Sequence, residues 1–323
     1  MKSAFSYRVY GLVVKSEIEL PELPACARDT PHDLMIRAGD VPEHLDDVQH
    51  QSYWFQVNAQ ACLIGVPHVC RLHIRDGREI IFERLKRSDG HPAAAADLRL
   101  YLLGSGMGVA LHQRGWLPLH VGAVRAGNRI WAFTGPSGAG KSTLAATLHL
   151  RCGLPLVSDD VMALRLYPAQ PPQVFPGPRK LKLWQDAAEH LRCDPEDLVQ
   201  DLSGTDKFQL YLGDEGGQAD PGPEPLHALV LLESSADAGP ASLERLSGAQ
   251  AFDVCLTALY RPYMAYWYRS RQAVMADLLA LCSHTRIYRF RRHWSLANME
   301  QQLAPLLDAM HSADEPIAQV ASG

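Results

Sequence analysis

A glycine-rich segment at residues 135–142, with the sequence GPSGAGKS, constrains this chain more than any other feature. It fits the pattern G-x-x-x-x-G-K-[ST], in which backbone N–H groups surround phosphate oxygens, the lysine reaches the terminal phosphates and the hydroxyl binds Mg²⁺. The pattern is meaningful only between a strand and a helix. Residues 129–134 are an apolar run of strand length, and residues 142–151 are rich in helix formers.

This context favours a nucleoside triphosphate site over a glycine-rich turn without a ligand. The N-terminus of the predicted helix adds its partial positive charge to the same anion site. The residues predicted to contact the nucleotide are Gly135, Pro136, Ser137, Gly138, Ala139, Gly140, Lys141, Ser142 and Thr143.

Two consecutive aspartates, Asp159 and Asp160, follow a second apolar segment at residues 154–157. We interpret that segment as a strand that ends in acid beside the phosphate loop, as in sites where a carboxylate reaches the magnesium ion. One carboxylate can bind metal while its neighbour accepts a proton from an attacking hydroxyl. The alternative is an Asp pair that caps the next turn.

The overall composition narrows the class of protein. The net charge of −5 provides no basic surface for nucleic acid, and no apolar run is long enough to span a membrane. The N-terminus lacks the apolar core of a secretory signal. The seven cysteines include no C-x-x-C pair, so we expect free thiols without metal. We therefore expect a cytoplasmic protein that binds neither nucleic acid nor membrane; homo-oligomer formation stays open.

We predict an α/β fold with a mixed sheet, preceded by a small β-rich domain. Runs with period-two alternation, separated by Pro and Gly, predict strands in the first part of the chain. Three glycines at alternate positions from Gly104 to Gly108 weaken the middle of the helix predicted next. The predicted segments are a β-rich N-terminal domain (1–90), a connecting helix (91–114), a nucleotide-binding catalytic domain (115–311) and a disordered tail (312–323).

Four cations downstream of the aspartates are candidates for contact with phosphate or with an acidic substrate. Strand alternation puts Lys180 and Lys182 on one face, and Lys207 follows a polar stretch typical of a mobile loop that closes over a substrate. A solvated face is the alternative, because exposed lysines are usual. The candidates are Arg179, Lys180, Lys182 and Lys207.

Three short motifs together carry a family resemblance. His120 and Gly122 lie on a predicted strand, the glycine-rich segment follows, and a further strand leads to Asp159 and Asp160. In this order and spacing, residues 115–165 resemble the catalytic domain of the HPr serine kinase/phosphorylase family, which is related to phosphoenolpyruvate carboxykinases. The resemblance implies a P-loop domain that uses ATP and Mg²⁺.

The same resemblance implies a role for each matching residue. Lys141 matches the phosphate-binding lysine and Ser142 the magnesium-binding hydroxyl. Asp159 matches the base that acts on the acceptor serine, Asp160 its neighbour near the metal, and His120 the histidine beside that base. Which aspartate is the base and which binds metal stays open.

The parts of the chain outside residues 115–165 bear on which substrate the protein uses. The N-terminal region does not resemble that of the HPr enzymes, and their second glycine-rich signature is absent from the sequence. Residues 7–12 (YRVYGL) and 21–24 (PELP) instead are similar to HPr-kinase-like proteins of bacterial peptide clusters, which phosphorylate the C-terminal serine of a lasso-peptide precursor. This implies a serine kinase with a peptide substrate in lasso-peptide biosynthesis. The alternatives are an HPr(Ser) kinase, a small-molecule kinase and a non-catalytic ATP-binding regulatory module.

Overall fold

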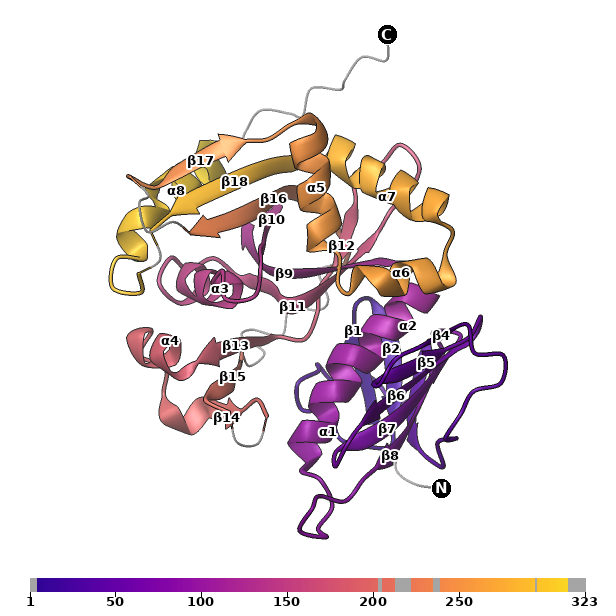
Figure 1. Cartoon of the computed structure of the whole chain (residues 1–323). Coiled ribbons are helices and arrows are strands. Elements are labelled where there is room, and N and C mark those ends of the chain that lie inside the picture. The colour runs from indigo at the N-terminus through magenta and orange to yellow at the C-terminus, as the bar shows by residue number, and fades with distance from the viewer. Residues whose placement is uncertain (1–4, 203–204, 213–221, 235–238, 294, 313–323) are drawn as a thin grey trace.

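The computed structural model describes residues 5–202, 205–212, 222–234, 239–293 and 295–312. Within these residues the chain is a mixed α/β protein with three sheets (Figure 1). The tail predicted to be disordered, 312–323, lies outside the described residues except for Ser312, which ends the last helix.

The N-terminal part of the chain forms an eight-stranded sheet. Its spatial order is β1-β2-β3-β8-β7-β6-β5-β4, with β2, β3 and β8 paired in parallel and the other neighbours antiparallel. The strands are β1 (Phe5–Val9), β2 (Leu12–Ser16), β3 (Leu34–Ala38), β4 (His50–Gln51), β5 (Phe55–Val57), β6 (Ala61–Val66), β7 (Cys70–Arg75) and β8 (Glu79–Arg84).

A long helix covers this sheet and leads to the rest of the molecule (Figure 1). It consists of α1 (Ala95–Tyr101), a π-helical segment (Leu102–Gly106) and α2 (Met107–Gln113). The glycines therefore change the helix type without ending the helix. A Cβ at Gly108 would lie 2.5 Å from the ring of Tyr260, so this glycine lets the aromatic ring pack closely on α2.

The central sheet has the order β10-β9-β11-β12-β16-β18-β17. Because β10 also pairs with β16, five of these strands form a closed ring of pairings. β9 and β10 pair antiparallel and form a hairpin. The strands are β9 (Leu117–Ala126), β10 (Arg129–Thr134), β11 (Leu156–Arg165), β12 (Gln173–Phe175), β16 (Glu224–Ser234), β17 (Ser242–Arg245) and β18 (Arg286–Arg292).

Helices bury both faces of the central sheet. Leu144 and Leu148 of α3 pack with Trp131 and Phe133 of β10, whereas Leu119 of β9 faces a second apolar core. That second core also receives buried side chains of α5 and α7. The helices are α3 (Lys141–Leu150), α5 (Gly248–Ala258), α6 (Pro262–Tyr268), α7 (Arg271–His284), a 3-10 turn (Glu300–Leu303) and α8 (Ala304–Ser312).

A small third sheet with the order β13-β15-β14 lies beside β11 and α3 (Figure 1). The sequence, with five prolines in residues 167–178, predicts a loop without regular structure before this sheet. That prediction is wrong, because β12 lies within the segment and pairs with β11 and β16. The elements here are β13 (Lys180–Trp184), α4 (Gln185–His190), a 3-10 turn (Pro195–Asp197), β14 (Leu198–Gln200) and β15 (Lys207–Tyr211).

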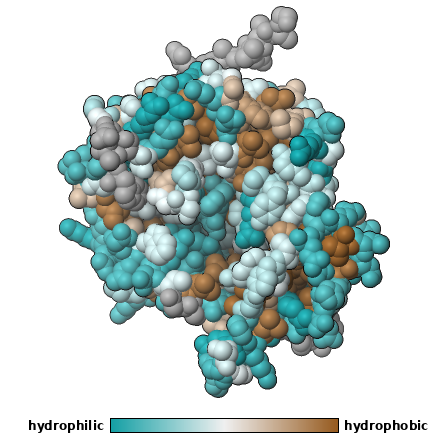
Figure 2. Space-filling model, in the orientation of Figure 1, coloured by the Kyte–Doolittle hydropathy of each residue, from teal (hydrophilic) through white to brown (hydrophobic). Residues whose placement is uncertain are grey.

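The aromatic group at residues 260–268 connects the two large sheets. Tyr263 and Trp267 of α6 contact the ring of Phe55 on β5, with ring centroids 5.9 and 4.6 Å from it. On the face shown in Figure 2, hydrophobic residues form separate patches among hydrophilic ones. None of the helices in the described ranges is both long and apolar enough to cross a membrane.

Candidate functional site

Residues 135–140 connect the end of β10 to the first turn of α3. Gly140 is the N-cap of α3 and has φ +80°, in the left-handed region that favours glycine. Pro136, Ser137 and Gly138 are exposed, and Ala139 N–H donates to the Pro136 carbonyl at 3.1 Å. The loop is therefore a tight turn whose outer residues face solvent at a helix N-terminus, where backbone N–H groups can bind an anion.

Lys141 lies across this loop. Its Nζ donates to the carbonyl oxygens of Gly135 at 3.0 Å and Pro136 at 3.2 Å, and only 8% of the residue is exposed. Burial lowers the pKa of the ammonium group, and the carboxylates of Asp159 and Asp160 oppose that effect. The lysine and both aspartates are thus neighbours, as a site that neutralises terminal phosphates requires.

The expectation that a strand ends at the aspartates is wrong, because β11 continues from Leu156 to Arg165. The strand is irregular at the aspartates, but it does not end there. The register between β9 and β11 shifts between Leu156 and Ser158, and Asp160 has φ +80°. A non-glycine residue in this conformation costs on the order of 1–3 kcal/mol and is typical of functional sites. Because of the irregularity, both carboxylates reach Lys182 of β13.

Asp159 occupies the buried side of the pair, with 3% of the residue exposed. Its Oδ2 accepts a hydrogen bond from the Lys182 backbone N–H at 2.8 Å, and no described group bonds to its Oδ1. Burial raises the pKa of this carboxyl to about 6, while the Lys182 N–H and the nearby Ser142 hydroxyl act to lower it. A buried oxygen without a partner requires an explanation, and a bound cation supplies one.

Asp160 occupies the accessible side, with 28% of its side chain exposed. Its Oδ2 lies 2.6 Å from Lys182 Nζ, and its Oδ1 lies 3.6 Å from His120 Nε2. Burial acts to raise the pKa of Asp160, but the charges of Lys182, His120 and Lys180 bring it below the usual value. Asp160 is therefore ionised at neutral pH and faces the histidine.

His120 lies on β9 directly opposite Val161, and its ring meets the ring of Tyr260 edge-on at 6.3 Å. Burial and then the charge of Lys141 lower the pKa of the imidazole, which Asp160 opposes. The imidazole is therefore mostly neutral at pH 7. The structure places His120 beside Asp160, whereas the family resemblance implies a histidine beside Asp159.

Gly122 explains how the helix comes so close to the acidic strand. It pairs with Asp159, and a Cβ at this position would lie 2.9 Å from the Lys141 carbonyl oxygen and 3.0 Å from the Ala145 Cβ. Any side chain here would push α3 away from β9. The sequence motif contains this glycine two residues after His120, but sequence reasoning gave it no function.

Lys180 and Lys182 project into a buried polar cluster, so a solvated face is the wrong interpretation for these two lysines. Lys180 is 4% exposed, its Nζ donates to Gln209 Oε1 at 3.0 Å, and burial lowers its pKa to about 8. Lys182 is 9% exposed, and its Nζ also lies 3.9 Å from Asp201 Oδ1. Sequence reasoning missed Asp201 and Gln209, because neither belongs to a motif.

The other two candidate cations, Lys207 and Arg179, lie at or just before the starts of strands in the small third sheet. Lys207 is the first residue of β15, directly after the polar stretch, and its Nζ lies 5.7 Å from the Trp184 ring. After burial, its positive charge is among the causes that lower the pKa values of His120 and Lys141. Arg179 precedes β13 and is partly exposed. Lys207 therefore acts on the site electrostatically.

The residues present fit a magnesium ion held mainly by a nucleotide. Among the described residues, no group of three or more His, Cys, Asp and Glu side chains is arranged to hold a metal ion. Mg²⁺ does not need such a group, since one or two protein oxygens suffice when phosphates and waters supply the rest. The Ser142 hydroxyl and the unpartnered Oδ1 of buried Asp159 provide those oxygens.

Comparison with known proteins gives little beyond this geometry. No protein-family profile matches the chain, and no curated protein matches it. Among solved structures, the chain is similar to the HPr(Ser) kinase/phosphatase from Coxiella burnetii. The two share 10% sequence identity and a TM-score of 0.32 over 61% of this chain and 99% of that chain. Similarity at this level supports no conclusion about function, which must be argued from the site itself.

Proposed function

We propose that this protein is an ATP- and Mg²⁺-dependent kinase that transfers the γ-phosphoryl group to a serine hydroxyl of a peptide. The observation that carries the proposal is that three groups of residues meet at one stretch of β9 and β11. There, a loop suited to phosphate, the pair of Ser142 and buried Asp159, and an accessible His120–Asp160 pair adjoin one another.

The pair of Ser142 and buried Asp159 is suited to the metal. Ser142 stands in the first turn of α3 and Asp159 stands opposite Gly122, so both are fixed by regular structure. Bound there, Mg²⁺ would neutralise charge on the phosphates. Lys141 is positioned to contact the terminal phosphates from the other side of the loop.

The accessible pair is suited to the acceptor. Asp160 takes the hydroxyl proton as the serine oxygen forms its bond to the γ-phosphorus, and the bond from that phosphorus to the β–γ bridging oxygen breaks to release ADP. His120 orients the Asp160 carboxylate, and Lys182 holds its other oxygen. Most of the rate then comes from positioning and charge neutralisation. This assigns the base to Asp160 and the metal to Asp159, the reverse of the roles implied by the resemblance.

The peptide acceptor rests on the sequence resemblance at residues 7–12 and 21–24. We assign the C-terminal serine of a lasso-peptide precursor as the acceptor, and ATP as donor implies a cytoplasmic reaction. The test is the intact mass of a serine-terminated lasso precursor and of an HPr protein after incubation with the kinase, ATP and Mg²⁺. One added phosphate on the precursor, lost when its terminal serine is replaced, is the expected result. Transfer to HPr alone contradicts the peptide assignment.

Two matched variants test the roles of the aspartates. Asp160→Asn should bind ATP in the presence of Mg²⁺ as the wild type does, yet lose transfer. Asp159→Asn should need a higher Mg²⁺ concentration for nucleotide binding. Asp253→Asn, on the exposed side of α5, is the control. Near-normal transfer by Asp160→Asn refutes the base assignment, and unimpaired transfer by both variants refutes kinase activity at this site.

A further inference from the structure

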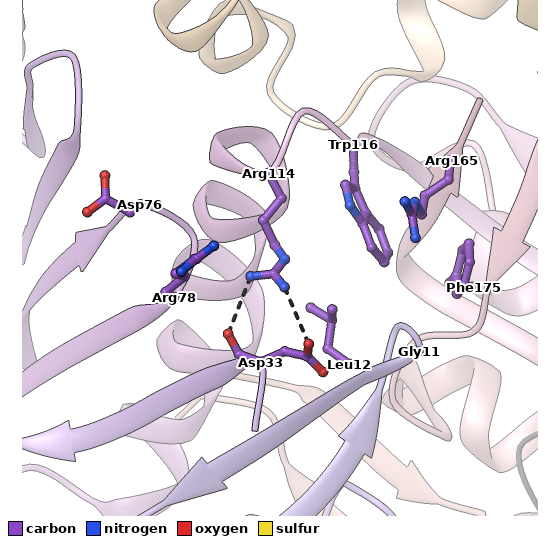
Figure 3. A pocket seen from close by; sticks show the side chains of 9 residues that line it. All are labelled: Gly11, Leu12, Asp33, Asp76, Arg78, Arg114, Trp116, Arg165 and Phe175. Carbon is purple, nitrogen blue, oxygen red and sulfur yellow. Dashed lines mark hydrogen bonds and ion pairs between the residues drawn. The ribbon is translucent and has the colours of Figure 1, made fainter. Parts of the chain in front are cut away.

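A cavity of about 420 Å³ lies where β9 begins and β11 ends, beyond the candidate active site on the same two strands. Residues from the eight-stranded sheet, from the turn after α2 and from the ends of β11 and β12 line it (Figure 3). The side chains that matter here are Asp33, Arg78, Arg114, Trp116, Arg165 and Phe175. We call this the arginine cavity.

Three guanidinium groups face the arginine cavity. Arg165 stacks over the rings of Trp116 at 5.2 Å and Phe175 at 6.0 Å, which restricts its movement. Arg114 donates to the Gly77 carbonyl at 2.7 Å and lies 3.8 Å from Asp33 Oδ1. None of the ion pairs among the described residues joins Arg78 or Arg165 to a carboxylate.

The three arginines influence one another. Burial lowers the pKa of Arg114, Asp33 opposes this, and the charges of Arg78 and Arg165 add to the lowering. An anion in the cavity would relieve this repulsion. Planar guanidinium groups match carboxylate and phosphate oxygens two at a time, so either anion has the right geometry.

The charge of the lining favours a carboxylate. Asp33 and Asp76 also line the cavity, so three positive and two negative side chains leave a net charge of +1. One carboxylate balances this charge, whereas a phosphate group carries about −1.5 to −2 at neutral pH and would be repelled by both aspartates. Trp116 and Phe175 are only 8% and 9% exposed and lie beneath Arg165, so the exposed lining of the cavity is mainly polar.

The arginine cavity and the candidate active site lie on the same side of β11. Val161 and Ala163 face the core that contains Trp116 and Phe175, and by alternation Arg165 lies on that face. His120 pairs directly with Val161, so its side chain shares the face. Arg165 lies four positions after Val161 on β11, which is about 13 Å along a strand.

We propose that the arginine cavity binds an acidic side chain of the acceptor peptide and so holds the peptide while its serine reaches Asp160. This rests on the proposed kinase function. The cavity would select peptides with a carboxylate several residues from the acceptor serine.

The probes are synthetic peptides with one serine and one Glu placed three to ten residues from it, each with a Gln twin. The KM for phosphorylation is measured with the full-length protein. At one spacing or more, the Glu peptide should have a KM about tenfold lower than its Gln twin, as expected for a charge-assisted pair. Arg165→Gln and Arg78→Gln should each abolish that difference with kcat unchanged. Arg245→Gln, at an exposed position on β17, should preserve it.

Equal KM values for Glu and Gln peptides at every spacing, or a preference that survives both cavity variants, would overturn the proposal. Direct titration of the peptides by calorimetry separates this result from failure of the kinase function. Carboxylate-dependent binding that needs Arg165 supports the cavity even when no phosphate is transferred. Free succinate is the final probe in these titrations. If it binds as tightly as the best Glu peptide, the cavity binds a small acid and the peptide assignment is wrong.

Discussion

Replacing Asp159 by asparagine should stabilise the folded protein above pH 6, even though it would disable the proposed metal site. Asp159 is 3% exposed, and its charged form lacks a partner on Oδ1 among the described residues. The asparagine oxygen can still accept the hydrogen bond from the Lys182 N–H, so the change removes the charge and little else. The wild-type charge is therefore a cost to folding that its function requires.

The size of the gain follows from the pKa of this carboxyl, which burial raises from 3.8 to about 6. Below pH 4 the group is protonated in both the folded and unfolded states, and it costs nothing. Between pH 4 and 6 the folded state binds more protons, so its stability falls as pH rises. Above pH 6 the full cost remains, which is about 3 kcal/mol for a shift of about two pKa units.

Urea denaturation of wild type and Asp159→Asn at pH 5 and pH 8, without Mg²⁺ or nucleotide, measures this cost. The free energy of unfolding of the variant should exceed that of the wild type by about 3 kcal/mol at pH 8 and by about half as much at pH 5. The exposed control Asp253→Asn should change neither value. A variant that is no more stable than the wild type at pH 8 would refute the view that Asp159 is an uncompensated buried charge.

Three further changes test other contacts of the site. Lys141→Ala should weaken ATP binding about tenfold or more in a calorimetric titration and abolish transfer, because a charged contact to phosphate is lost. Lys182→Met leaves Asp160 without its 2.6 Å partner, so it should cost about 3–5 kcal/mol in urea denaturation and move the pH–rate profile of transfer to higher pH as the pKa of Asp160 rises. Gly122→Ala should raise the KM for ATP, because its Cβ would meet the Lys141 carbonyl and Ala145.

Local sequence patterns predicted the parts of the fold that depend on neighbouring residues. The hairpin of β9 and β10, and the helix after the glycine-rich loop, follow from short-range apolar patterns and turn residues. Strands of two to four residues, such as β4, β14 and β17, were missed because so few residues establish no period. The apolar pattern near the end of the chain predicts a helix over residues 296–310, but the structure has a 3-10 turn that starts at Glu300 and an α-helix only from Ala304.

The environment of the aspartates could not be predicted from local patterns. Two consecutive acids in an apolar run are typical of a strand end, yet β11 continues because β9 pairs with it on both sides of the irregularity. The burial of Lys182 also could not be predicted from local patterns, because its partners are distant in the sequence. Its partners Asp160 and Asp201 lie 22 residues before it and 19 residues after it, and only the packing of the small sheet against β11 brings them together.

The opposite pKa shifts of two adjacent aspartates support the division of labour between them. Burial without a positive partner on Oδ1 raises the pKa of Asp159, whereas Lys182 and His120 bring that of Asp160 below its usual value. Below about pH 6, where the Asp159 carboxyl carries a proton, metal binding there is coupled to proton release. Asp160 stays ionised throughout, and 28% of its side chain is exposed. Environments that separate two pKa values in this way are how one site assigns different roles to chemically identical groups.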